Sequence, residues 1–286
     1  MNYSLRVKKR YILLLLVVIA LSWFSNSFYF RMTDQEVENY FKGIKSPVIE
    51  YIGIDDHKMR YLWMDNDKNT TVIFVHGAPG SSSAFIDYFK NNELIQEVNL
   101  ISIDRLGYGY SDFGKVVISL KEQAEAIKQV KVYHELEKVI LVGHSLGAPI
   151  IGQAVFDHPD LYDGLLLVSG SVDPELEEKE WYRPWLRNTL MKSVLPTTFY
   201  TTNEEIYHLK EQLVDLKTKW NQLNLPVIVI HGKADQLVPV ENTVFLRERI
   251  PARHCEIWLE PGVNHFIPWN RPDLIVNGIL KLERKL

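Results

Sequence analysis

The chain has 286 residues, 46% of them hydrophobic, and a formal net charge of −4. The near balance of acidic and basic residues gives no sign of a nucleic-acid partner. The single cysteine, Cys255, excludes an intramolecular disulfide, and its strand-like surroundings predict a core position. Beyond the first 30 residues, about 250 remain, the size of one large α/β domain.

The N-terminal segment has the pattern of a membrane-inserted helix. An apolar run over residues 11–30, long enough for about one bilayer crossing, follows four basic residues: Arg6, Lys8, Lys9 and Arg10. The basic flank predicts that the N-terminus stays cytoplasmic. A signal peptide cleaved near residue 21 or 26 is the alternative, but the aromatic residues at the end of the run are typical of an interfacial belt and favour a retained anchor. We expect an anchor at 1–30, a linker at 31–45 and a catalytic domain at 46–286 across the membrane, in the periplasm or outside the cell.

Short apolar runs then alternate with helical segments. An antiparallel pair is predicted at 47–54 and 59–64, followed by six bare hydrophobic strands at 71–75, 100–103, 139–142, 164–168, 226–230 and 256–259. Runs that are apolar on both faces are typical of a parallel sheet covered by helices on each side. Helices are predicted after a capping box at Ser119, at 242–249 and at 274–286. The order predicts an α/β fold with a doubly wound, mostly parallel eight-stranded sheet.

One interval is too long for a simple crossover between strands. More than fifty residues separate the strands that end near 169 and begin at 226, and helical periodicity runs from 204 to 220. We interpret residues 172–222 as an inserted helical cap. Three of its aromatic residues are predicted to bind substrate: Trp181, Trp185 and Trp220.

The sequence Gly143-His144-Ser145-Leu146-Gly147 follows an apolar strand and precedes a helix. This is the strand, G-x-S-x-G turn and helix arrangement of a nucleophile elbow, with Ser145 at the tip. A turn this tight needs glycines two residues before and after the serine, because Cβ atoms there would collide. The helix that follows directs unsatisfied N–H groups and its positive dipole end toward an anion formed at the serine.

A serine nucleophile needs a base, and the base needs a group that orients it. His265 follows the last predicted strand, and Asp235 follows the strand before it. In a parallel sheet both loops lie at the carboxyl edge, where the elbow also presents Ser145. The order serine, aspartate, histidine is the one this architecture requires. Asp173, which follows the preceding strand, is an alternative acid.

The tetrahedral oxyanion needs two N–H donors. Leu146, the residue after the nucleophile, supplies one. The second is expected from the loop at 76–82 after the third strand, where Pro79 has no N–H and Ala78 is left as the donor. We interpret His76, like His144 and His231, as a histidine that braces its loop.

Five segments together resemble the α/β-hydrolase superfamily, over residues 46–286. They read HGAPGSS at 76–82, DRLGYGYSD at 104–112, GHSLG at 143–147, HGKADQLVP at 231–239 and GVNHF at 262–266. The first two look most like the branch of epoxide hydrolases, haloalkane dehalogenases and prolyl aminopeptidases. Epoxide hydrolases and dehalogenases have an aspartate where this chain has Ser145, and prolyl aminopeptidases usually have a tryptophan-bearing elbow. The resemblance therefore implies the serine esterase and lipase branch.

The sequence predicts a membrane-anchored serine hydrolase that cleaves apolar or lipidic carboxylic esters through an acyl-enzyme. The expected triad is Ser145, Asp235 and His265, the expected oxyanion hole is Ala78 and Leu146, and no metal or organic cofactor is expected. A thioesterase, amidase, aminopeptidase or acyltransferase would use the same residues. A non-catalytic ligand-binding protein on this fold is the alternative from another class. The expected partners are a small-molecule or lipid ester and the membrane.

Overall fold

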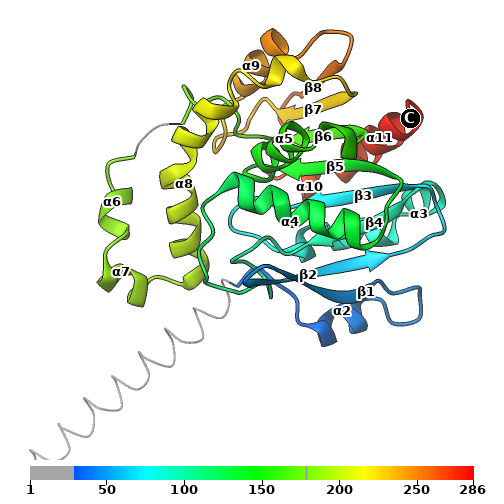
Figure 1. The fold of residues 1–286 in the computed structure, drawn as a ribbon, viewed down its shortest axis with the longest axis horizontal. Coiled ribbons are helices and arrows are strands. Elements are labelled where there is room, and N and C mark those ends of the chain that lie inside the picture. The colour runs from blue at the N-terminus through cyan, green and yellow to red at the C-terminus, as the bar shows by residue number, and fades with distance from the viewer. Residues whose placement is uncertain (1–28, 178–179) are drawn as a thin grey trace, which may run out of the picture.

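The computed structural model describes residues 29–177 and 180–286. Its eight strands form one sheet in the order β1-β2-β4-β3-β5-β6-β7-β8 (Figure 1). β1 pairs antiparallel with β2 and β2 with β4, and all other neighbours are parallel. The strands are β1 Val48–Ile54, β2 His57–Met64, β3 Thr70–Val75, β4 Asn99–Ile103, β5 Lys138–His144, β6 Gly164–Val168, β7 Val227–Gly232 and β8 Cys255–Glu260. The prediction of a mostly parallel eight-stranded α/β sheet is confirmed.

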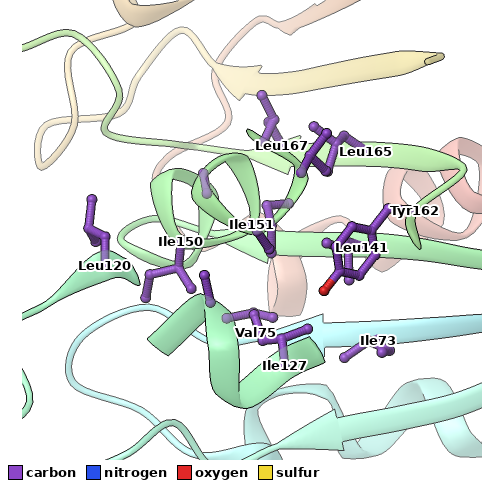
Figure 2. Close-up of a cluster of buried hydrophobic side chains, with 14 of the residues drawn as sticks. Ile73, Val75, Leu120, Ile127, Leu141, Ile150, Ile151, Tyr162, Leu165 and Leu167 are labelled. Atoms are coloured by element: carbon purple, nitrogen blue, oxygen red, sulfur yellow. The ribbon is translucent and has the colours of Figure 1, made fainter. Parts of the chain in front are cut away.

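Helices cover both faces of this sheet, so the side chains on both faces of its inner strands are buried. Along β3, Ile73 and Val75 belong to one buried cluster, while Val72 and Phe74 belong to the other. Figure 2 shows the first cluster, in which strand residues meet Ile127 of α4 and residues of α5. The two faces are covered by α4 Leu120–Tyr133 and α5 Gly147–Asp157, and by η1 Ser82–Lys90, α3 Asn92–Glu97 and α11 Pro272–Glu283.

The remaining short elements lie between strands or, in the case of α10, between β8 and α11. They are η2 Pro159–Leu161, η3 Trp220–Gln222, α9 Asn242–Arg249 and α10 Ile267–Asn270. The capping box predicted at Ser119 is formed in one direction, since its hydroxyl accepts the N–H of Glu122. The Glu122 carboxylate lies 3.1 Å from Nε2 of His57.

The segment predicted as a linker at 31–45 packs on the domain. It contains helix α2, Asp34–Tyr40, which begins with a capping box formed by Thr33 and Glu36. Val37 and Phe41 are each 1% exposed and join the second buried cluster. Met32 and Tyr40 pack against the same cluster but are only partly buried. Two fully buried apolar residues are too few to give the helical periodicity that a prediction relies on.

The predicted anchor at 1–30 lies almost entirely outside the described residues. Within 29–177 and 180–286, no helix is long and apolar enough to cross a bilayer.

Among the described residues, three α-helices lie between β6 and β7, in the interval predicted to form a cap. They are α6 Arg183–Leu186, α7 Thr189–Val194 and α8 Thr197–Leu216, and they stand at one side of the sheet in Figure 1. α8 begins seven residues before the predicted helical stretch at 204. Its first turns bury polar side chains, Thr201, Thr202 and Glu205 among them, so no apolar stripe marks them in the sequence.

Candidate active site

Ser145 occupies a strained turn between β5 and α5. Its φ is +55°, in the left-handed region that L-residues rarely adopt. Its N–H donates to the Val168 carbonyl at 2.9 Å, which ties the turn to the next strand. A Cβ on Gly143 would lie 2.5 Å from the Gly147 carbonyl oxygen, and one on Gly147 would lie 2.3 Å from that of Val75. The glycines are therefore required by contact, as the nucleophile elbow predicts.

Asp235 and His265 meet at the same edge of the sheet. The Nδ1 of His265 lies 2.8 Å from Oδ2 of Asp235, in the loops after β8 and β7. The other carboxylate oxygen accepts the N–H groups of Leu237 and Val238, each at 2.9 Å. Burial raises the pKa of Asp235, but hydrogen bonds from His231, His265 and Val238 outweigh it and hold the pKa below its ordinary value. The carboxylate stays ionised and can orient the imidazole.

Two further histidines hold these loops. The Nε2 of His231 lies 3.1 Å from the Val238 carbonyl and 3.3 Å from Asp235, so it carries the proton that both acceptors require. The Nε2 of His144, the residue before Ser145, lies 3.0 Å from the carbonyl oxygen of His265. The centroids of the two imidazole rings are 4.8 Å apart. Burial and the neighbouring His265 lower the pKa of His144 to about 3, which keeps it neutral. His144 thus links the elbow to the loop of His265.

The loop after β3 lies directly beside Ser145. A Cβ on Gly77 would be 2.8 Å from the Cβ of Ser145, so only glycine fits there without a shift. The peptide unit that follows carries the N–H of Ala78, and Leu146 stands at the first turn of α5. The structure therefore brings both predicted oxyanion donors to the neighbourhood of the serine.

The alternative acid Asp173 has other partners. Its carboxylate accepts the N–H of Glu175 at 3.0 Å, and its own N–H donates to Asn242 at 2.9 Å. Of the two candidate acids, Asp235 is the one whose carboxylate contacts the Nδ1 of His265, at 2.8 Å.

The three predicted cap tryptophans do not lie together. Trp181 and Trp185 are 81% and 71% exposed. Trp220 is fully buried, with its ring 5.0 Å from that of Phe156, and a Cβ on Gly152 would come within 2.7 Å of it. Trp220 therefore packs the core against α5, which corrects its predicted place in a substrate pocket. Whether Trp220 is exposed or buried depends on its contact with α5. The local sequence does not encode that contact.

Sequence reasoning missed the roles of two residues in the segment after β4. Asp104 accepts the N–H groups of Ser82 at 2.6 Å and Tyr110 at 2.8 Å. Arg105 reaches Gly77 and the cap. Both residues lie in the DRLGYGYSD signature, which was the available signal. In the described part of the chain, no three His, Cys, Asp or Glu side chains are grouped as metal ligands would be.

Comparisons with known proteins support the fold. A family model described as alpha/beta hydrolase fold matches residues 70–199. An uncharacterized protein of Mycobacterium tuberculosis is 26% identical over 128 residues, which cover 45% of this chain and 36% of that protein, so the chain matches about a third of the length of the first curated relatives. The monoglyceride lipase of Rattus norvegicus is 20% identical over 251 residues, which cover 76% of this chain and 82% of that protein.

A solved esterase from a Rhodococcus species shares the fold. Its TM-score is 0.62 at 18% identity, with 83% of this chain and 99% of that chain covered. An eight-stranded sheet of this topology with a serine on a glycine-flanked elbow defines an α/β-hydrolase. The chain has the alpha/beta hydrolase fold, and its family-model match and its similar proteins support an enzyme of this type.

The hydrogen bonds to Asp235 predict a specific response to acid. Because its pKa is lowered from 3.8 in the folded protein, its ionised form stabilises the fold above that value, and this stabilisation is lost as the pH falls through the folded pKa. We expect the free energy of unfolding of the wild type to fall more steeply below about pH 4 than that of Asp235→Asn. Urea unfolding of both proteins across this range measures the difference. Equal slopes for the wild type and Asp235→Asn would contradict the assignment.

Proposed function

We propose that this protein is a serine hydrolase that cleaves apolar or lipidic carboxylic esters through an acyl-enzyme. The observation that carries the proposal is the 2.8 Å contact between Asp235 and the Nδ1 of His265, at the sheet edge where the elbow presents Ser145. An ionised carboxylate on Nδ1 selects the tautomer that leaves Nε2 free to accept a proton. This is the arrangement that acyl transfer to a serine requires.

The reaction follows from these positions. His265 takes the hydroxyl proton through Nε2 as the Ser145 oxygen attacks the ester carbonyl. The N–H groups of Ala78 and Leu146 stabilise the oxyanion, and the positive end of α5 adds to their field. His265 then protonates the leaving alcohol, and the acyl-enzyme remains. A water molecule, deprotonated by His265, repeats the sequence, releases the carboxylic acid and restores the serine.

An apolar acyl group is the proposed substrate class. The names of two similar proteins support this substrate class: one relative is a monoglyceride lipase, and one solved neighbour is an esterase. The cap adds exposed Trp181 and Trp185, which offer apolar surface to a long acyl chain.

We also propose that residues 1–30 anchor the protein in a membrane, with the catalytic domain on the far side from the cytoplasm. The basic residues at 6–10 and the apolar run that follows them support this topology. The chain that leaves this segment is held on the domain, because the Ser81 hydroxyl donates to the Phe30 carbonyl at 2.6 Å and the Arg31 guanidinium lies 4.2 Å from the Tyr110 ring. An anchor at this point would keep the domain close to the bilayer.

The triad is tested by single substitutions. Ser145→Ala and His265→Ala should each lower turnover of p-nitrophenyl esters by about 10⁴- to 10⁶-fold, because the residues act as a unit. Asp235→Asn should cost somewhat less, about 10³- to 10⁴-fold. Asp173→Asn, the matched control, should stay near wild type. A fluorophosphonate probe should label the wild type and not Ser145→Ala. Wild-type turnover in Ser145→Ala, or loss in Asp173→Asn without loss in Asp235→Asn, would overturn the assignment.

The cap surface is tested by acyl chain length. Trp181→Ala combined with Trp185→Ala should raise KM for long-chain esters by about fivefold or more, equal to about 1 kcal/mol of lost apolar contact, and leave KM for acetate near wild type. Tyr133→Ala, which removes an exposed aromatic ring from the end of α4, serves as the control. An equal change for both esters would mean that these tryptophans do not bind the acyl chain.

The topology is tested by protease added to intact spheroplasts. The domain at 31–286 should be digested before lysis. Protection until lysis would place it in the cytoplasm and overturn the proposal. N-terminal sequencing of the mature protein separates an anchor from a cleaved signal peptide, since a new N-terminus at Trp23 or Phe28 would show cleavage.

A further inference from the structure

A buried ion pair joins the cap to the body of the enzyme. Arg105, after β4, donates to both carboxylate oxygens of Glu205 on α8, at 2.6 and 3.1 Å. The two side chains are 0% and 3% exposed. The Tyr108 hydroxyl donates to the same carboxylate at 2.5 Å and lies 3.1 Å from the Thr202 hydroxyl. Such a pair is costly to bury, and an apolar contact of similar volume would hold two elements together at least as well.

The same arginine reaches the loop beside the nucleophile. Its second terminal nitrogen, Nη2, also donates to the carbonyl oxygen of Gly77 at 3.1 Å. That oxygen lies 2.6 Å from Nδ1 of His76. The backbone N–H of Arg105 donates to the other ring nitrogen of His76 at 3.0 Å, so the His76 proton is on Nδ1 and is donated to Gly77. Burial and the charge of Arg105 keep the pKa of His76 well below its ordinary value, so the ring is neutral.

The Gly77 carbonyl and the Ala78 N–H are parts of one peptide unit. A trans peptide is planar, with its C=O and N–H directed oppositely. Two donors that fix the carbonyl therefore fix the direction of the N–H, which points away from Arg105. Hydrogen bonds to the carbonyl also polarise the unit and strengthen its N–H as a donor. Since Gly77 lies against Ser145, the orientation of this peptide decides how well one oxyanion donor is aimed.

We propose that Arg105 and Glu205 are positioning residues for the oxyanion hole, through which the seating of cap helix α8 controls the catalytic rate. This inference rests on the proposed serine hydrolase function. Glu205 holds the guanidinium in the plane from which Arg105 also reaches the Gly77 carbonyl. When α8 is displaced, that alignment is lost and Ala78 is free to turn. A seated cap, as over a bound acyl chain, therefore completes the oxyanion hole.

Two substitutions separate this role from simple stabilisation. Glu205→Gln keeps the shape of the side chain and removes the charge that fixes Arg105. Arg105→Lys keeps the ion pair, but a single ammonium cannot reproduce the planar fork that reaches Glu205 and Gly77 together. Glu204→Gln is the matched control, because Glu204 is the neighbouring residue on α8 and its ion pair with Arg187, at 3.0 Å, lies within the cap.

We expect each of the two variants to lower kcat by about 10- to 100-fold, less than the loss of a complete oxyanion donor, with KM changed by no more than about twofold. The inhibition constant of a trifluoromethyl ketone should rise by the factor by which kcat/KM falls, because this ketone forms the oxyanion that Ala78 would bind. Glu204→Gln should change neither quantity. Rates are counted per active site labelled by a fluorophosphonate, so that unfolded protein does not contribute.

The outcomes are distinguishable. If the wild type is labelled at Ser145, and both Glu205→Gln and Arg105→Lys keep the wild-type kcat and ketone inhibition while only Tm falls, the pair is structural and this inference is wrong. An equal loss of kcat in Glu204→Gln would also overturn it, because any weakening of the cap would then have the same effect. If the wild type is not labelled and Ser145→Ala keeps its activity, the proposed function fails and takes this inference with it.

Discussion

The close approach of β5, its turn and α5 to β3 is the constraint on which the site depends. At Gly143 and Gly147 an added Cβ would come within 2.5 Å of backbone oxygen atoms. This contact turns the chain sharply enough to hold Ser145 at φ +55° and brings the first turn of α5 behind it. It also sets the distance to the loop after β3, where Gly77 meets Ser145. Replacing either elbow glycine would move Ser145 and the loop after β3 together, since both rest on the same backbone contact.

The sheet and the sharp turn at Ser145 were predictable because their signals are local. A strand buried on both faces is a bare apolar run, and all six such runs appear as parallel strands in the sheet. The elbow is readable from five consecutive residues. Segments with polar or sparse burial were not predictable in this way. Helix α2 is held by the buried Val37 and Phe41 and by the ion pair of Asp34 with Arg60, at 2.9 Å. The start of α8 buries threonine and glutamate side chains. Their stability comes from tertiary partners, which a window of sequence does not contain.

The site shows the same division between local and distant signals. Asp235 and Asp173 both follow strands at the carboxyl edge, and only the contact with His265 separates them. The roles of Asp104 and Arg105 were hidden because their partners are distant in the chain: Ser82 lies 22 residues from Asp104, and Glu205 lies 100 residues from Arg105. The motif around them marks the loop, but only the fold shows that it braces the oxyanion side.

Two buried arginines hold the loops around Ser145 through hydrogen bonds, which depend on direction. Arg60 donates to Asp104 at 3.3 Å and to the Ser82 hydroxyl at 3.1 Å, while Arg105 joins Glu205 to Gly77. An apolar contact between the cap and the loop would tolerate sliding, because its energy depends on area and hardly on direction. A buried guanidinium with two acceptors tolerates little sliding. Loss of one partner leaves an uncompensated buried charge, which destabilises the protein by about 3–5 kcal/mol. The buried charges between α8 and the loop after β3 therefore cost stability but fix the orientation of the Gly77–Ala78 peptide. A peptide N–H must be oriented in this way if it is to stabilise an oxyanion.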